Sequence, residues 1–222
     1  MEVYAHPGPA SERQRRSQAQ RSAATRAHLI DAARQLFADK GFAGVSTQAI
    51  VAAAGVTRGA LYHQFADKAA LFAAVYEEVE QDIVAQVGER IVAEQPPDGL
   101  SAMRTGARLF LERCSDPDVQ QIILIDAPAV LGWERWREVG ERYGLGVIEA
   151  MLTQAVAEGV IPRQPLRPTA HVLLGALDEA ALYVSRAPEP EQARAEMYEV
   201  CDRLIAGLSS AAATVNPSRR RP

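Results

Sequence analysis

The chain has 222 residues, a mass of 24.1 kDa and a formal net charge of −4 at pH 7, and 48% of its residues are hydrophobic. No apolar stretch reaches the roughly 20 residues that a membrane-spanning helix needs, and the first 22 residues lack the apolar core of a secretory signal. Two cysteines, Cys114 and Cys201, are too few for a disulfide framework. These features exclude membrane-spanning and disulfide-rich classes and predict a globular cytoplasmic protein.

The net charge is the sum of regions that carry opposite charge. Residues 1–70 hold nine basic and five acidic residues, whereas residues 71–216 hold twelve basic and twenty-three acidic residues. Three arginines follow in the last four residues. The overall charge argues against a nucleic-acid partner, but the basic N-terminal region favours one, so the motifs must decide.

Helical periodicity runs along the whole chain, and no alternating strand pattern occurs. Residues 122–125 form an apolar run too short to separate a strand from a buried helix, and the helical surroundings favour a helix. The sequence predicts an all-α protein of about nine helices, with a flexible basic arm over residues 1–24 and a disordered tail over residues 209–222. The expected helices cover 25–40, 47–54, 58–65, 68–91, 100–114, 118–131, 133–157, 169–186 and 191–208.

Residues 25–70 have the local signals of a helix-turn-helix unit. Ser46 and Thr57 precede two short helices and offer side-chain oxygens as N-caps. Gly55 lies between these helices, where the tight turn needs a residue that tolerates a positive φ. Leu61 and Phe65 are expected to face inward and to turn the rest of the second short helix toward solvent.

Four stretches of this region resemble the TetR family of transcriptional regulators. Leu29–Phe37 resembles the first helix of that family, and Lys40–Phe42 and Ser46–Ile50 follow with the same order and spacing. The longest match runs over Ala54–Leu71. Gln64 departs from the pattern, because the family commonly carries His at this position.

The resemblance implies DNA-contacting roles for one set of side chains. Residues at the start of the first short helix would contact phosphates, those at the start of the second would read bases, and the others would contact phosphates or thymine methyl groups. The set is Thr47, Gln48, Arg58, Gly59, Ala60, Tyr62, His63, Gln64 and Lys68. Arg58 is the best candidate for reading guanine, because its planar fork matches O6 and N7. Lys68 would anchor a backbone phosphate.

Several of these roles have plainer alternatives. Tyr62 could pack in the core, and His63 could be an ordinary surface residue. The basic arm, with Arg13, Arg21 and Arg26 among its arginines, could reach flanking DNA or could simply be a solvated tail.

Residues 71–208 are expected to form a larger helical domain for ligand binding and dimerisation. Residues 121–138 resemble a C-terminal domain of some TetR-like regulators, whose architecture implies a pocket among the middle helices. Residues 169–186 are apolar on nearly all sides and residues 191–208 carry a strong apolar stripe, so both helices need more cover than one subunit offers. We therefore expect a homodimer through these two helices.

Residue type suggests which side chains line the pocket. Large apolar residues would form its walls, and three polar residues inside apolar segments would orient a ligand, although an Asp paired with an arginine such as Arg137 is the plainer alternative. The candidates are Met103, Phe110, Asp126, Trp133, Trp136, Tyr143, His171, Asp178 and Tyr183. No nucleophile–base set or third metal ligand accompanies them, so we expect neither an enzyme nor a cofactor nor a metal site.

These expectations define a ligand-responsive repressor that binds a palindromic DNA operator as a homodimer and is released by an unknown small-molecule effector. Activation instead of repression remains open within the same class. The alternative from another class is a helical protein that binds or modifies a small molecule and carries a vestigial DNA-binding motif.

Overall fold

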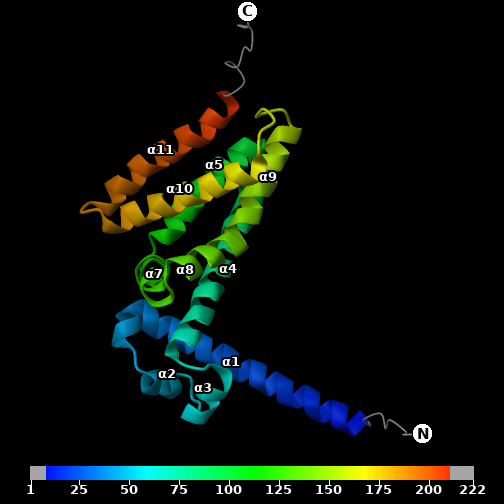
Figure 1. Ribbon diagram of the computed structural model, residues 1–222, viewed down its shortest axis with the longest axis vertical. Helices are drawn as coiled ribbons and strands as arrows, with labels where there is room; N and C mark the ends of the chain where they lie inside the picture. The colour runs from blue at the N-terminus through cyan, green and yellow to red at the C-terminus, as the bar shows by residue number, and fades with distance from the viewer. Residues whose placement is uncertain (1–8, 211–222) are drawn as a thin grey trace, which may run out of the picture. The chain divides into compact units, whose positions relative to one another are not determined.

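A computed structural model describes the backbone of residues 9–210 and the side chains of residues 18–209. Within this part of the chain the secondary structure is helical, without strands (Figure 1). In chain order the helices are α1 (Pro9–Gly44), α2 (Thr47–Ala53), α3 (Arg58–Gln64), α4 (Lys68–Glu94), α5 (Gly99–Cys114), α6 (Pro117–Val119), the π-helical η1 (Gln120–Asp126), α7 (Ala127–Leu131), α8 (Trp133–Gly140), the π-helical η2 (Glu141–Leu145), α9 (Gly146–Ala157), α10 (Leu166–Arg186) and α11 (Pro190–Ser210).

The predicted all-α class is confirmed, and so is the number of helices. The segments α6, η1 and α7 follow one another without a break, as do α8, η2 and α9, which leaves nine helical runs in the described residues. The apolar run 122–125 lies within η1, so it is helical. No described helix is both long enough and apolar enough to cross a membrane.

The N-terminal arm differs from the expectation for residues 1–24. Instead of a flexible segment, α1 begins at Pro9 and continues to Gly44. Alanine, glutamine and arginine are frequent between residues 10 and 24, and these are strong helix formers. Ser22 accepts a hydrogen bond of 2.7 Å from the side-chain amide of Gln64, which ties this part of α1 to α3. Residues 1–8 and 211–222 lie outside the described part of the chain, whereas residues 209 and 210 end α11.

The chain forms two compact units, residues 1–76 and 77–222. The division falls inside α4, six residues beyond the expected boundary at residue 70, because the first turns of α4 belong to the core of the first unit. Phe72 and Tyr76 are both fully buried there. The rings of Phe37 and Phe42 pack edge-on against Phe72, with centroids 5.2 and 5.3 Å away.

Backbone conformation and helix caps shape the first unit as expected. Gly41 has a φ of 66° and ends the straight part of α1, and Gly55 has a φ of 65° between α2 and α3. Ser46 accepts a hydrogen bond from the amide of Ala49, and Thr57 accepts one from the amide of Ala60. Only glycine takes such positive φ values without strain, so Gly55 sets the direction in which α3 leaves the turn.

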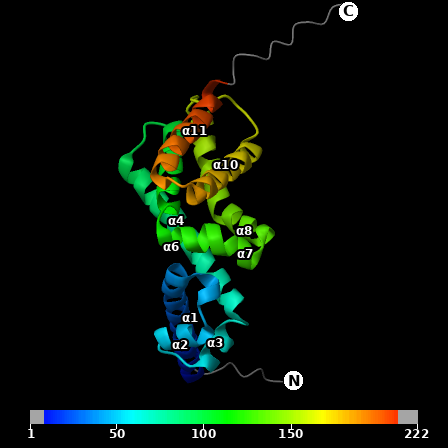
Figure 2. The same cartoon turned by 90° about the vertical axis from the view of Figure 1, so that its left-hand side faces the viewer.

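The second unit is a bundle in which α5 packs against α9 and α11, and α10 packs against α9 and α11. The helices α10 and α11 lie side by side in both ribbon views (Figure 2). Gly99 marks a close approach between backbones, because a Cβ atom there would lie 2.6 Å from the amide nitrogen of Ala155 in α9. Its own amide donates a 2.7 Å hydrogen bond to the carboxylate of Glu158.

Candidate nucleic-acid interface and internal cavity

The short helix α3 turns one face into the core of the first unit and the other toward solvent. Leu61 is fully buried and Phe65 is 4% exposed, so these two residues fix the rotation of the helix. Arg58 and His63 lie on the exposed face. Tyr62 is 44% exposed, which argues against the alternative that it packs in the core. The base-reading candidates therefore lie on one accessible surface.

A polar cluster joins the start of α2 to this face of α3. The Arg58 guanidinium carbon lies 5.6 Å from the centroid of the Tyr62 ring. Hydrogen bonding to the Arg58 side chain lowers the pKa of the Tyr62 hydroxyl, with a smaller contribution from a hydrogen bond to Thr47. Gln48, Gly59 and Tyr62 are exposed, as is Arg58. Arg58 is thus held beside Tyr62 on the solvent-exposed surface of α3.

Two predicted DNA contacts have structural roles that the sequence did not indicate. The Lys68 ammonium donates 2.8 Å hydrogen bonds to the carbonyl oxygens of Phe42 and Val45 and lies 4.0 Å from the centroid of the Phe42 ring. Gln64 donates to Ser22. Two of the three ammonium N–H groups are engaged, so Lys68 fastens the end of α1 to the start of α4. Its contact with a DNA phosphate stays a prediction.

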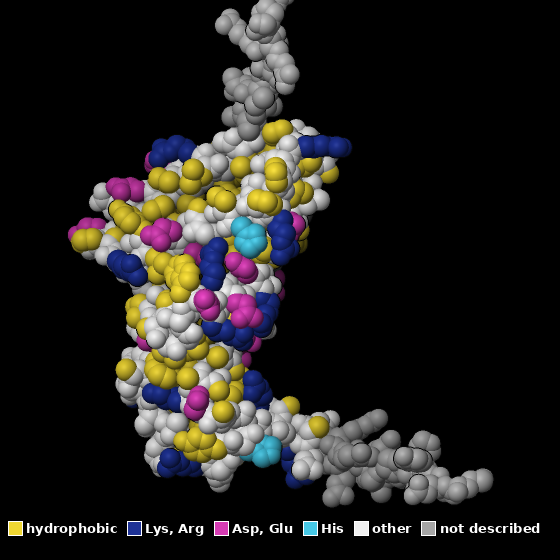
Figure 3. Space-filling view, viewed as in Figure 1, with side chains coloured by type: hydrophobic (Ala, Val, Ile, Leu, Met, Phe, Trp, Pro, Cys, Tyr) yellow, Lys and Arg dark blue, Asp and Glu magenta, His cyan; other side chains and the backbone are white. Residues whose placement is uncertain are grey.

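Basic side chains outnumber acidic ones around this motif. On the face drawn in Figure 3, the charged side chains of the first unit are mainly Lys and Arg, whereas Asp and Glu are frequent over the second unit. The guanidinium of Arg26 lies 4.4 Å from the centroid of the Phe65 ring, so this arginine of the predicted arm packs beside α3. The side chain of Arg13 lies outside the described residues.

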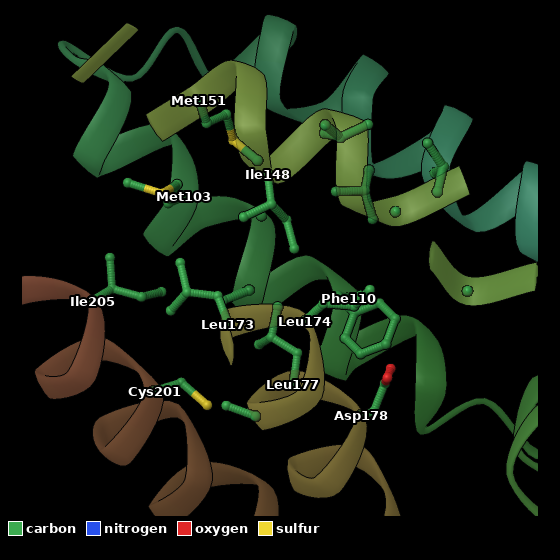
Figure 4. Close-up of a pocket in the computed structure, with 18 of the residues that line it drawn as sticks. Met103, Phe110, Ile148, Met151, Leu173, Leu174, Leu177, Asp178, Cys201 and Ile205 are labelled. Atoms are coloured by element: carbon green, nitrogen blue, oxygen red, sulfur yellow. The ribbon is translucent and has the colours of Figure 1, made fainter. Parts of the chain in front are cut away.

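The second unit contains an apolar cavity of about 100 Å³. Helices α4, α5, α9, α10 and α11 contribute to its wall, together with Gly144 of η2 (Figure 4). Met103, Phe110 and Asp178, all three predicted from the sequence, line this cavity. The sequence-based selection missed much of the wall, including Val87, Ile148, Met151, Leu173, Leu177 and Ile205.

The six other ligand candidates are not among the residues that line the cavity. Trp133 and Tyr183 are 60% and 53% exposed, and Trp136 is buried with its ring 4.7 Å from that of Trp133. The Tyr143 hydroxyl accepts a 2.9 Å hydrogen bond from Gln81, and His171 Nδ1 lies 3.6 Å from a Glu141 carboxylate oxygen. The expectation that these residues line one pocket is corrected for Asp126, Trp133, Trp136, Tyr143, His171 and Tyr183.

Asp178 combines the two alternatives that its sequence position left open, since it is paired with an arginine and still lines the cavity. Arg137 Nη1 donates a 2.5 Å hydrogen bond to Asp178 Oδ2, and Arg137 Nε lies 3.6 Å from a Glu141 carboxylate oxygen. Burial raises the pKa of Asp178 to about 6, although Arg137 acts in the opposite direction. Together with Glu80, Asp178 places a carboxyl residue in an otherwise apolar wall.

Metal-binding groups are not a feature of the described residues: they contain no cluster of three or more His, Cys, Asp or Glu side chains that could hold a metal ion. The arrangement offers two kinds of chemistry, a surface suited to DNA and an apolar cavity suited to a small molecule.

Comparison with known proteins identifies the class to which both features belong. Residues 29–75 match the family described as "Bacterial regulatory proteins, tetR family", and residues 100–208 match the "Tetracyclin repressor-like, C-terminal domain". The chain belongs to the TetR family of transcriptional regulators. Proteins of this family bind DNA and form dimers, and they are regulators and not enzymes.

Individual relatives agree with this assignment. The chain is 41% identical to the regulator AcrR of Shigella flexneri over 36% of this chain and 37% of AcrR. It is 32% identical to the regulator CymR of Pseudomonas putida over 60% of this chain and 70% of CymR. A solved TetR-family regulator from Pectobacterium atrosepticum superposes with a TM-score of 0.75 and 29% identity, covering 85% of this chain and 96% of that one. The chain spans 37% and 64% of the length of its first two curated relatives.

Proposed function

We propose that this protein is a ligand-responsive repressor that binds a palindromic operator as a homodimer and leaves it when a small molecule occupies the cavity of the second unit. The observation that carries the proposal is the exposed Arg58–Tyr62 face of α3, presented by a helix-turn-helix whose caps and turn are all formed. In a helix-turn-helix protein, such a face enters the major groove.

The contacts within this face support direct reading of bases. Arg58 presents a planar fork that can donate two hydrogen bonds to one guanine. Gly59 and Ala60 add little bulk beside it, so the helix backbone can approach the base edges closely. Thr47 and Gln48, at the start of α2, are suited to phosphate contacts that fix the position of the helix without reading sequence.

Exposed apolar side chains on α10 and α11 support a homodimer. Val172 and Tyr183 on α10 are 71% and 53% exposed, and Val200 and Leu204 on α11 are 40% and 54% exposed. These are half of the large hydrophobic side chains that are exposed in the described residues. Covering them with the same two helices of a second copy would remove apolar surface from water and would supply the second half of a palindrome-reading protein.

The shared helix α4 supports control by a ligand. Its first turns, with Phe72, lie in the core of the first unit, and its later turns supply Val84 and Val87 to the cavity wall. A ligand that favours one position of α4 over another would therefore change the affinity for DNA. Coupling of about 1–3 kcal/mol corresponds to a 5- to 150-fold change in affinity.

The test is recovery of DNA fragments bound by the full chain from a genomic or random library, followed by footprinting and light scattering. We expect a palindromic sequence whose half-sites are centred about one helical turn apart, roughly 34–36 Å. We also expect a dimer at micromolar concentration. The absence of any enriched sequence, or a monomer that binds a single half-site, would contradict the proposal.

A further inference from the structure

We propose that the cavity takes a neutral molecule of about one aromatic ring that carries a hydroxyl group, and that this hydroxyl donates a hydrogen bond to Asp178. The inference rests on the proposed function, since it names the class of effector. It depends on three features of the cavity: the kind of polar group in its wall, its volume and its charge.

The polar side chains of the wall are hydrogen-bond acceptors. Among the residues that line the cavity, Glu80 and Asp178 carry the polar side-chain atoms other than sulfur, and both are carboxyl residues. An ionised carboxylate accepts hydrogen bonds and cannot donate them. Figure 4 shows the Asp178 carboxyl group directed into the cavity beside the Phe110 ring. A ligand must therefore bring a donor, and carboxylates, phosphates and acyl thioesters of anionic carriers are disfavoured.

The volume restricts the size of the ligand. A closed apolar cavity of roughly 150 Å³ accommodates benzene. The cavity here measures about 100 Å³, so it takes about one ring after small movements of its wall. Met103 and Met151 point into the space in Figure 4, and unbranched methionine side chains adapt readily to a ligand.

The charges around Asp178 favour a neutral hydroxyl over an ammonium group. Arg137 offsets part of the Asp178 charge through a 2.5 Å hydrogen bond to Oδ2, and it also lies 3.6 Å from a Glu141 carboxylate oxygen. That bond engages one carboxylate oxygen, which leaves the acceptor capacity of Oδ1 for the ligand. Stripping water from an ammonium ion in an apolar space is far more unfavourable than stripping it from a hydroxyl group. A hydroxyl gains the hydrogen bond without that loss.

Four probes of similar size test these features on the unmodified protein at pH 7.5: phenol, toluene, benzoate and benzylammonium. Binding is measured by calorimetry or ligand-observed NMR. We expect phenol to bind about tenfold more tightly than toluene, as one hydrogen bond to a buried charged acceptor implies. Benzoate should bind more weakly than toluene. Equal affinity for phenol and toluene, or tighter binding of benzoate or benzylammonium than of phenol, would overturn the proposal.

Two variants test whether the hydroxyl group of the ligand binds Asp178. Asp178→Asn keeps the side-chain shape but removes the charged acceptor, so the preference for phenol over toluene should fall toward one while toluene still binds. Phe110→Leu is the matched control, because it changes the apolar wall beside Asp178: both affinities should fall and their ratio should stay near ten. A preference that survives in Asp178→Asn would overturn the assignment. The four-probe comparison decides the ligand class even if a variant does not fold.

The same samples separate this inference from the proposed function. Binding to the recovered operator fragment is measured without probe and with saturating phenol. An operator-binding protein that does not distinguish phenol from toluene would overturn the ligand class and leave the DNA-binding function standing. A protein that binds phenol through Asp178 but no DNA sequence would support the ligand class and contradict the proposed function.

Discussion

Replacing Asp178 by asparagine removes a titrating group from the cavity wall, and the structure gives the sign of the effect on stability. The pKa of Asp178 is raised from 3.8 to about 6 in the folded protein, mainly because the carboxyl group is buried. Between these two pH values the folded chain holds a proton that the unfolded chain releases. Stability from this group is therefore present at low pH and is lost as the pH rises through about 6.

The size of the effect follows from the same shift. The displacement of the pKa is about two units, and each unit corresponds to about 1.4 kcal/mol. The Asp178 side chain is 18% exposed, so screening by solvent is limited. Relative to Asp178→Asn, the wild-type protein should lose up to about 3 kcal/mol of unfolding free energy between pH 4 and pH 7.

Urea denaturation followed by tryptophan fluorescence measures this difference in the relevant unit, because both tryptophans, Trp133 and Trp136, lie in the second unit. Asp118→Asn is the matched control, since it makes the same chemical change at a side chain that is 46% exposed. The reasoning would be refuted if wild type and Asp178→Asn gave parallel curves. A gain of wild-type stability with rising pH would show that pairing with Arg137 outweighs burial.

Three further substitutions test packing, capping and the role of Lys68. Gly99→Ala places a Cβ atom 2.6 Å from a backbone nitrogen of α9 and should destabilise the second unit by about 1–3 kcal/mol in urea denaturation. Gly88→Ala is the control: a Cβ atom there has nothing within 4 Å, so the substitution should stabilise the unit by up to about 1 kcal/mol. Equal effects of the two substitutions would contradict the close approach at Gly99. Thr57→Ala removes the cap of α3 and should destabilise the first unit by about 1 kcal/mol, seen as faster amide hydrogen exchange in α3, and unchanged exchange would argue against the cap. Lys68→Met should lower the thermal stability of the first unit without changing the salt dependence of DNA affinity. A slope of log affinity against log salt concentration that is smaller by about one would instead support a phosphate contact by Lys68.

Local signals in the sequence predicted the helix-turn-helix unit in detail. The positive φ of Gly55 and the caps at Ser46 and Thr57 depend on residues within three positions along the chain. The inward direction of Leu61 and Phe65 follows from helical spacing. Such features can be read from one sequence because their physical causes are close together in it.

Features that depend on contacts between residues far apart in the sequence were not predicted. Lys68 binds carbonyl groups 23 and 26 residues away, and no local pattern distinguishes this use from a phosphate contact. On α10, Asp178 lines the cavity whereas Tyr183 is 53% exposed, although both were selected by residue type. Their directions depend on how α10 packs against α9 and α11, which helical periodicity alone does not specify.

The π-helical segment η2 is a second feature that the sequence alone did not predict. Glycines at 140, 144 and 146 are unfavourable inside a helix such as the one expected over residues 133–157. The wider hydrogen-bonding pattern of Glu141–Leu145 could not be predicted from them. Gly144 fits against Leu174 of α10, where an added Cβ atom would lie 3.2 Å from a Leu174 methyl group, so the reason for this glycine lies in tertiary packing.

The most direct test of the central proposal compares Arg58→Ala with Arg163→Ala on the recovered operator. Both substitutions remove one positive charge, but Arg58 lies on the exposed face of α3, whereas Arg163 is exposed between α9 and α10. Binding titrations against the operator and against single-base variants should show that Arg58→Ala loses about 1–3 kcal/mol and relaxes the preference at one base pair in each half-site. Arg163→Ala should match the wild type. Equal affinity and unchanged base preference for Arg58→Ala would contradict the account.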